Sequence, residues 1–308
     1  MIPNGYNTIP TSQWLQAIIA GAKTLGNVFY VDSGSGSDAA GYGALPETPT
    51  ATIDYAIGLC TADNGDIIIV LPGHVETITG TGITVDIAGI SVFGLGKGSL
   101  MPWVKHNHAA AEVSIAADNV IWQGIRHSAD VTAVLVGIEI EDGADYCTVK
   151  ECLFDVVATT TDEFLVTIRT NDASNFALIE DNDIDMGLGG AVAAISFTKD
   201  TDGTIVRNNR IQGDYSTANI NGITTASTKL LIEDNLLING GTGALGTEPV
   251  VELLTGSTGV IRRNDVVCNL GTMVASVVAD ACMRFQNFYN EDVGDSTGAV
   301  FGVASADG

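Results

Sequence analysis

Apolar and polar residues alternate over short stretches of this chain, and one pattern occurs four times. It reads LIEDNDID at 178–185, IVRNNRIQ at 205–212, LIEDNLLI at 231–238 and VIRRNDVV at 260–267. Each copy has two apolar residues, two polar ones, an asparagine in fifth place and a further apolar residue in seventh. Short apolar segments of this kind are typical of β-strands, because the apolar residues of a helix recur every three or four positions.

The asparagine of this pattern marks an internal repeat that covers most of the chain. The position holds asparagine five times, at spacings of 27, 26, 29 and 23 residues, and continues backwards to Cys152, Gly124 and Gly94. A second apolar segment lies between successive marks, for example AVLVGIEI at 133–140, and GAVFGVA at 298–304 follows the last one. Units of this length, with two short strands and no helix, predict a parallel β-solenoid. A leucine-rich repeat needs a fixed leucine spacing that is absent, and a propeller blade needs about 40 residues.

The asparagines of the repeat need hydrogen-bond partners, because they lie between residues that a solenoid buries. Equivalent positions of successive coils stack about 4.8 Å apart, so each amide can bond to the amides above and below it. Asparagine also tolerates the left-handed backbone conformation of a sharp bend. We therefore predict a structural asparagine ladder, which consists of Asn182, Asn209, Asn235, Asn264 and Asn287.

The residue two places before each mark alternates in charge along the repeat. From coil to coil, this position holds Lys150, Glu180, Arg207, Glu233 and Arg262. Opposite charges attract when neighbouring strands bring them side by side, and like charges repel. The alternation predicts a structural charge ladder on the surface, in which each exposed pair contributes about 0–1 kcal/mol to stability.

Composition and charge narrow the classes of function. The 308 residues include 36 glycines and 7 prolines, and 37 acidic residues against 13 basic ones give a net charge of −24. Such a surface repels nucleic acids and anionic membranes, so neither is expected as a partner.

No apolar run reaches the length of a membrane span, about 18 residues, and the start MIPNGYNTIP lacks the features of a signal peptide. The five cysteines show no metal-binding spacing and are predicted to be buried thiols, and no cofactor is expected.

The segment before the repeat resembles the start of right-handed parallel β-helix proteins of the pectin-lyase-like superfamily. It carries NVFYVDSGSGSD at 27–38, PETPTATIDYAIGLC at 46–60 and NGDIIIVLPGHVE at 64–76. The resemblance implies an all-β, right-handed parallel β-helix domain over residues 28–308. It also implies a cap helix at Thr52–Cys60, because the open end of a solenoid core must be covered.

Residues 1–27 precede this start and are predicted to form a short N-terminal helical arm. The segment TSQWLQAIIAGAKTLGN, at 11–27, has the spacing of an amphipathic helix. Its apolar face consists of Trp14, Leu15, Ile18 and Ile19. This face either packs on the solenoid or docks on a partner, and these four residues are therefore the candidates for partner docking.

The catalytic motifs of pectin-lyase-like enzymes are not found in the sequence. The GHG and RIK motifs of polygalacturonase-like sites are absent, as are the WIDH and RxPxxR motifs of pectate-lyase-like sites. Three aspartates at 181–185 lie close together, but the register places Asp183 opposite Arg210 of the next coil. Arg169 is the basic residue with the least evident structural role. The HNH segment at 106–108 has no acidic third ligand nearby, so a loop is expected there and not a metal site.

The resemblance and the missing motifs together favour a function without catalysis. A short arm followed directly by FYVDSGSGSD, at 29–38, resembles β-helical structural proteins of tailed bacteriophages. It implies an external virion protein, most consistent with capsid decoration (cement), that is made in the host cytoplasm and bound to the major capsid protein or another virion component. It also implies a homo-oligomer, with a trimer favoured. The alternative is a tailspike or another carbohydrate-active β-helix enzyme (a polysaccharide lyase or hydrolase), which a carboxylate pair or trio in one groove would favour. A bacterial adhesin would need an export signal.

Overall fold

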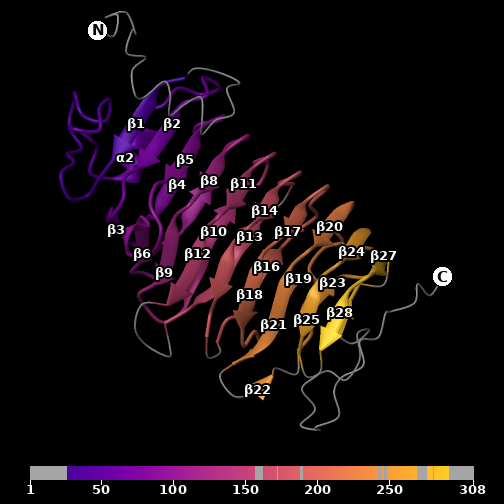
Figure 1. Ribbon diagram of the computed structural model, residues 1–308. Coiled ribbons are helices and arrows are strands. Elements are labelled where there is room, and N and C mark those ends of the chain that lie inside the picture. Colours follow the sequence, from indigo (N-terminus) through magenta and orange to yellow (C-terminus); the bar gives the residue numbers. More distant parts are fainter. Residues whose placement is uncertain are drawn as a thin grey trace, which may run out of the picture.

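The computed structural model is an all-β parallel solenoid, which confirms the fold predicted from the repeat (Figure 1). It describes residues 26–156, 162–171, 173–187, 190–241, 244–245, 248–268, 276–279 and 281–290. Between the first and last described turns, each turn of the chain contributes one short strand to each of three sheets, and strands of successive turns pair in parallel. The stack begins with β1 at the indigo end and finishes with β28 at the yellow end, so residues one repeat apart lie side by side.

The three sheets run along the length of the stack. Sheet 1 consists of β1 (Val28–Val31), β2 (Ile67–Val70), β5 (Ser91–Gly94), β8 (Ile121–Gln123), β11 (Thr148–Lys150), β14 (Leu178–Glu180), β17 (Ile205–Arg207), β20 (Leu230–Glu233), β24 (Gly259–Arg262) and β27 (Cys282–Phe285). Sheet 2 consists of β3 (Val75–Ile78), β6 (Trp103–His106), β9 (Arg126–Ala129), β12 (Leu153–Val156), β15 (Asp183–Asp185), β18 (Arg210–Gly213), β21 (Leu236–Gly241), β25 (Asp265–Val267) and β28 (Phe288–Asn290), with β22 (Ala244–Leu245) antiparallel to β21. Sheet 3 consists of β4 (Ile83–Val85), β7 (Val113–Ile115), β10 (Val134–Ile140), β13 (Phe164–Thr170), β16 (Ala193–Phe197), β19 (Ala218–Gly222), β23 (Val251–Leu253) and β26 (Val277–Val278).

The core is a column of apolar side chains enclosed by the three sheets. Equivalent residues of successive coils stack on one another, as Val149, Ile179, Val206 and Ile232 do in sheet 1, and all four are fully buried. Burial of a side chain of this size contributes about 1.5–3 kcal/mol. The column therefore supplies most of the stability. The rows of polar side chains at its edges fix which residues of successive coils lie side by side.

A short helix, α2 (Ile53–Ile57), packs against β1, β2 and β4 at the first end of the column. The Thr52 side chain accepts a hydrogen bond from the backbone N–H of Tyr55 at 3.3 Å and so begins the helix as its N-cap. The helix buries Ile53, Ala56 and Ile57. It covers the core where the cap helix was predicted, although it ends at Gly58 and is shorter than Thr52–Cys60.

The bend between sheets 1 and 2 differs from the prediction in one respect. The residue with positive φ is the one before each ladder asparagine and not the asparagine itself. Asp181, Asn208 and Asp234 have φ values of 56°, 56° and 57°. The left-handed backbone is therefore carried by an exposed or half-exposed neighbour, and the asparagine is left to point inward and form hydrogen bonds.

The same observation corrects the alignment of the earliest coils. Gln123 pairs with Lys150 and Arg126 with Leu153, so Ile125, and not Gly124, is equivalent to Cys152. Gly124 has a φ of 74° and occupies the left-handed position of its coil. The predicted marks at Gly94 and Gly124 are therefore one residue too early, because glycine takes the place that polar residues take in later coils.

Several predicted segments lie outside the described residues. They include the arm up to residue 25, with Trp14, Leu15, Ile18 and Ile19, and the last apolar segment at 298–304. Among the described residues, no helix is both long and apolar enough to cross a membrane.

Candidate functional site

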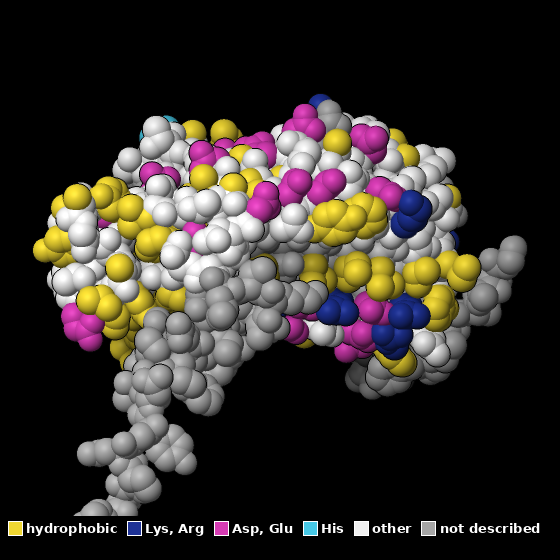
Figure 2. Space-filling model, turned by 90° about the horizontal axis from the view of Figure 1, so that it is seen from above, with side chains coloured by type: hydrophobic (Ala, Val, Ile, Leu, Met, Phe, Trp, Pro, Cys, Tyr) yellow, Lys and Arg dark blue, Asp and Glu magenta, His cyan; other side chains and the backbone are white. Residues whose placement is uncertain are grey.

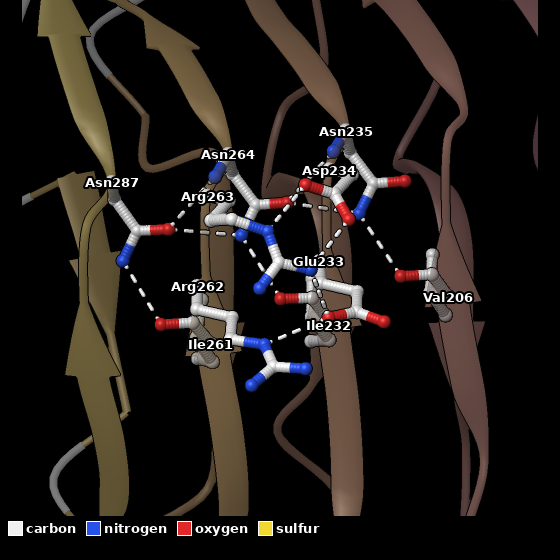
Figure 3. A network of polar contacts seen from close by, with 10 residues as sticks. All are labelled: Val206, Ile232, Glu233, Asp234, Asn235, Ile261, Arg262, Arg263, Asn264 and Asn287. Carbon is white, nitrogen blue, oxygen red and sulfur yellow. Dashed lines mark hydrogen bonds and ion pairs between the residues drawn. The ribbon is translucent and has the colours of Figure 1, made fainter.

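The five asparagines of the repeat lie in one buried row at the bend between sheets 1 and 2, and part of this row is shown in Figure 3. From Asn182 to Asn264, each side chain donates from Nδ2 to Oδ1 of the next asparagine, at 2.9–3.0 Å. The same Oδ1 accepts the backbone N–H of the preceding asparagine, at 2.9–3.0 Å. Each Nδ2 also donates to a carbonyl of the previous coil, as Asn235 does to Val206. The amides are thus occupied by one another and by the backbone, which is a structural and not a ligand-binding arrangement.

The charged residues of the repeat lie in register on the outer face of sheet 1. The Cα pairing matches, in order, Lys150, Glu180, Arg207, Glu233 and Arg262. Contacts join them in twos, since Arg207 pairs with Glu180 at 2.7 Å and Arg262 with Glu233 at 2.8 Å. Arg263 adds a second contact to Glu233 at 2.6 Å. Glu233 is only 7% exposed, so this part of the row is more buried than an ordinary surface ion pair.

Arg169, the basic residue without an evident role in the sequence, lies in a carboxylate cluster on sheet 3. Its guanidinium donates to Glu139 from Nε at 2.7 Å and from Nη2 at 2.6 Å. Glu139 forms a trio with Glu112 and Glu141, whose ligand oxygens all lie within 4.8 Å of one another. Ser114 donates to Glu141 at 2.8 Å. Burial, followed by the charge of Glu139, raises the pKa of Glu112 to about 7, so this carboxyl is partly protonated near neutral pH.

The sequence did not point to this carboxylate trio. Glu112 directly precedes β7, Glu139 lies within β10, and Glu141 directly follows β10. Their proximity depends on the pairing of these two strands, and the segments that lead to sheet 3 vary in length from coil to coil. A carboxyl with a raised pKa, that of Glu112, beside other carboxyl groups and a guanidinium suits acid–base chemistry. The same contacts also have a structural account, because Arg169 and Glu139 join neighbouring strands.

A groove of about 950 Å³ lies on the outer side of the solenoid and reaches the start of the charge ladder. Its charged lining consists of Lys97, Lys150, Glu151, Asp181 and Asp183. Asp183 forms an ion pair with Arg210 at 2.7 Å, as the register predicts. The lining therefore mixes both signs of charge and does not select an anionic or a cationic ligand.

The structure confirms a loop for Asn107 and His108 of the HNH segment, but His106 ends strand β6 and is fully buried beside His127. Trp122 donates from Nε1 to Nε2 of His127 at 2.9 Å, and Nδ1 of His127 lies 3.1 Å from Nε2 of His106. Nδ1 of His106 lies 2.7 Å from the carbonyl oxygen of Ala111. All three contacts are hydrogen bonds when both imidazoles are neutral and carry their proton on Nδ1. Burial lowers the pKa of His106 to about 4 and that of His127 well below its usual value.

The tryptophans within the described residues do not form an open stacking platform for a sugar. Trp122 is fully buried in the core. Trp103 is half-buried, with the Nζ of Lys105 at 4.0 Å and the guanidinium of Arg126 at 4.1 Å from its ring centre. These contacts occupy the ring surface on which a saccharide would stack.

Comparisons with known proteins give little beyond the architecture. No protein-family model and no curated protein matches the chain. Among solved structures, the chain is similar to an alginate lyase from Paenibacillus sp. str. FPU-7, with 16% identity, 77% of this chain and 92% of that chain covered, and a TM-score of 0.43. It is also similar to a tailspike protein of E. coli bacteriophage HK620 in complex with a pentasaccharide, with 13% identity and a TM-score of 0.35. That match covers 92% of this chain and 54% of the tailspike chain, so the present chain spans about half its length. Neither likeness is close enough to carry an argument.

Proposed function

We propose that the chain is a non-enzymatic structural protein of a tailed-phage virion, exposed on the outside of the capsid as a decoration (cement) protein. The observation that best supports this proposal is that the polar side chains at the bend between sheets 1 and 2 bond to neighbouring coils. The asparagines bond to one another, and Arg207, Arg262 and Arg263 are held by carboxylates of neighbouring coils. Side chains that a reaction would need are thus engaged in joining the coils of a long, rigid body.

A decoration protein must be held by its particle, and the arm is the proposed anchor. The solenoid core is already closed at its first end by α2, so the apolar face of Trp14, Leu15, Ile18 and Ile19 is not needed as a cap. An apolar helical face of this kind suits a groove on the major capsid protein or another virion component.

Two experiments test the virion proposal. A mass-spectrometric census of purified particles should find the chain at a fixed copy number, and its absence from particles contradicts the proposal. A chain that begins at Asn27 should remain soluble and rich in β-structure by circular dichroism. It should fail to bind particles that lack the protein, while the full-length chain rebinds them. If the shortened chain binds equally well, the arm is not the anchor.

The second candidate function is cleavage of a polysaccharide, and the trio of Glu112, Glu139 and Glu141 favours it. A protonated carboxyl near an ionised one is the arrangement that many glycosidases use. Incubation with host polysaccharides and measurement of new chain ends tests this function. Activity that is lost in Glu112→Gln and Glu139→Gln, but kept in Glu252→Gln on the same sheet, would replace the structural proposal with an enzymatic one.

A further inference from the structure

The outer face of sheet 1 carries a continuous row of apolar side chains, which we call the apolar band. The band consists of Leu178, Ile205, Leu231, Val260 and Met283. Each residue lies beside the next in the Cα pairing of successive strands, and the first four lie two positions before a charge-ladder residue of the same strand. Figure 2 views the molecule from above and shows a row of hydrophobic side chains beside a group of blue and magenta ones. Met283 is 67% exposed, and the other four are half-buried.

An apolar outer row is unexpected for a solenoid that stands alone. Alternate residues of a strand point to opposite faces, so the outer positions of a solvated sheet are normally polar. The core is complete without the band, because Ile179, Val206 and Ile232 fill the inner positions of the same strands. The band therefore adds apolar surface that folding leaves exposed, and such surface is typical of a binding face.

Two aromatic residues extend the apolar surface beyond the first band residue. Tyr146 and Phe176 stack with their ring centres 4.8 Å apart, and they are 56% and 41% exposed. Phe176 lies two residues before Leu178. Both aromatic residues have positive φ, 58° and 56°, a conformation that is uncommon for bulky side chains. The turn thus holds two rings at the surface at some cost in backbone energy, which is a recurrent property of binding sites.

The charges that border the band cancel one another. Four ion pairs surround it: Arg207 with Glu180, Arg262 with Glu233, Arg263 with Asp234 and Lys229 with Asp202. The chain as a whole carries a net charge of −24, which opposes contact between copies. Electrostatic repulsion between two copies is weakest at a face that is apolar and locally neutral. A nucleic acid or an anionic membrane, by contrast, would require an excess of positive charge.

We propose that the apolar band is the contact between two copies of this chain, packed side by side and antiparallel. A two-fold axis along the strand direction sets band against band and charge ladder against charge ladder. When the axis passes between the coils of Arg207 and Glu233, Arg207 of one copy lies opposite Glu233 of the other. Glu180 then lies opposite Arg262. An axis that passes through a coil would instead oppose charges of the same sign, so the alternation excludes such registers.

The same register also matches the apolar residues. Ile205 lies opposite Leu231, and Leu178 lies opposite Val260. Met283, the most exposed of the band, lies opposite the coil that contains Tyr146, where a thioether contacts an aromatic ring favourably. The face is therefore complementary to itself over its full length, as a two-fold symmetric interface requires. The pair formed in this way replaces the trimer that the phage resemblance implies.

Sedimentation velocity on the purified full-length protein tests this pairing and does not depend on the virion proposal. A face of this size is expected to associate weakly, with a dimer forming at about 10–100 µM. Leu231→Glu places a buried charge in the centre of the contact and should weaken dimerisation at least about tenfold. The matched control is Leu135→Glu, because Leu135 is an exposed leucine of sheet 3, 51% exposed and distant from the band in the pairing order. It should leave the dimer intact.

Two further readouts make the result decisive. At about 1 µM, where both proteins are monomeric, circular dichroism and the thermal midpoint should be nearly the same for Leu231→Glu and the wild type, since residue 231 is at the outer face. Small-angle scattering should give the dimer a longer maximum dimension than the monomer, because this register leaves β1, β2, β5 and β8 of each copy beyond the overlap. A wild-type protein that stays monomeric at about 100 µM overturns the proposal. The same result is expected if residues 1–25 of the same chain occupy the band, and that outcome also overturns it. A trimer, or equal effects of Leu231→Glu and Leu135→Glu, also overturns it.

Discussion

Two rows of polar side chains run side by side along the solenoid and join the coils in different ways. The asparagine ladder is neutral, buried and continuous from Asn182 to Asn287. The charge ladder lies two residues earlier in each coil and forms separate pairs, Arg207 with Glu180 and Arg262 with Glu233. An amide donates and accepts at once, so its row continues from coil to coil. The charged contacts fall into separate groups, because Arg207 holds Glu180 of the previous coil while Glu233 holds Arg262 and Arg263 of the next one. We infer that the asparagines hold the coils together and that the charges chiefly fix their register.

The largest expected effect on stability comes from acid, which protonates the buried pair of His106 and His127. An unfolded histidine has a pKa of about 6.5, and that of His106 in the folded protein is about 4. The folded-state pKa is lowered, so this contribution to stability is complete above pH 6.5 and is lost as the pH falls toward 4. The loss reaches about 3 kcal/mol for His106 alone. Urea unfolding at pH 7, 6 and 5 measures it.

The imidazole effect must be separated from that of Glu112. The pKa of this carboxyl is raised to about 7, so its protonation favours the folded state as the pH falls and acts in the opposite direction. His106→Gln keeps a hydrogen-bond donor and acceptor but removes the titrating imidazole. Between pH 6 and 5, the free energy of unfolding of the wild type should fall by about 1.4 kcal/mol per pH unit more than that of this variant. His108→Gln, at an exposed site, should behave like the wild type. If His106→Gln also behaved like the wild type, the neutral histidine pair would be refuted.

The next effect in size is the loss of one asparagine from the middle of its row. Asn209 donates to the Ile179 carbonyl and to Asn235, and it accepts two hydrogen bonds from Asn182. Asn209→Leu leaves these buried groups without partners and should cost about 2–3 kcal/mol in urea unfolding. The matched control is Gln123→Leu, an amide on the outer face with no hydrogen bond among the described residues, and it should change stability by less than about 0.5 kcal/mol. Equal changes in the free energy of unfolding for the two variants would mean that the buried hydrogen bonds of the asparagine ladder do not stabilise the fold.

A smaller effect is expected in the charge ladder. Glu233→Lys sets a positive charge beside Arg207, Arg262 and Arg263 and should cost about 2 kcal/mol at low salt, against about 1 kcal/mol for Glu233→Gln. The difference between the two variants should shrink in 1 M salt, because screening weakens repulsion between partly exposed charges. Identical costs at low salt would show that these charges do not interact across coils.

The sequence pattern was sufficient for the solenoid and for the position of both rows. Each unit of strand, bend and strand keeps a fixed frame around the asparagine, so residues such as Glu180 and Arg207 can be aligned by counting. The alignment was wrong at Gly124, where glycine replaced the polar residue of the left-handed position. The residues that pair between strands of sheet 3 could not be aligned by counting, because the segments that lead to this sheet differ in length from coil to coil.

The contacts that give rise to the most unusual chemistry were therefore missed. Glu112 and Glu139 meet only through the pairing of β7 with β10. His106 and His127 belong to β6 and β9, in coils that precede the asparagine frame, and their hydrogen-bonded chain has no signature in either segment. The apolar band was visible in the sequence as the first residue of LIEDN and its relatives. Its exposure became evident only when Ile179 and its equivalents were found to fill the core.

The most direct test of the central comparison is a pair of double-mutant cycles in one protein at about 0.15 M salt. The first cycle joins Asn209→Ala with Asn235→Ala, and the second joins Arg207→Ala with Glu180→Ala. The free energy of unfolding of each single and double variant gives the coupling within each pair. We expect a coupling of about 1.5 kcal/mol between the asparagines, and one below about 1 kcal/mol between the ions that weakens further in high salt. A coupling between Arg207 and Glu180 that equals or exceeds the coupling between the asparagines would contradict the account.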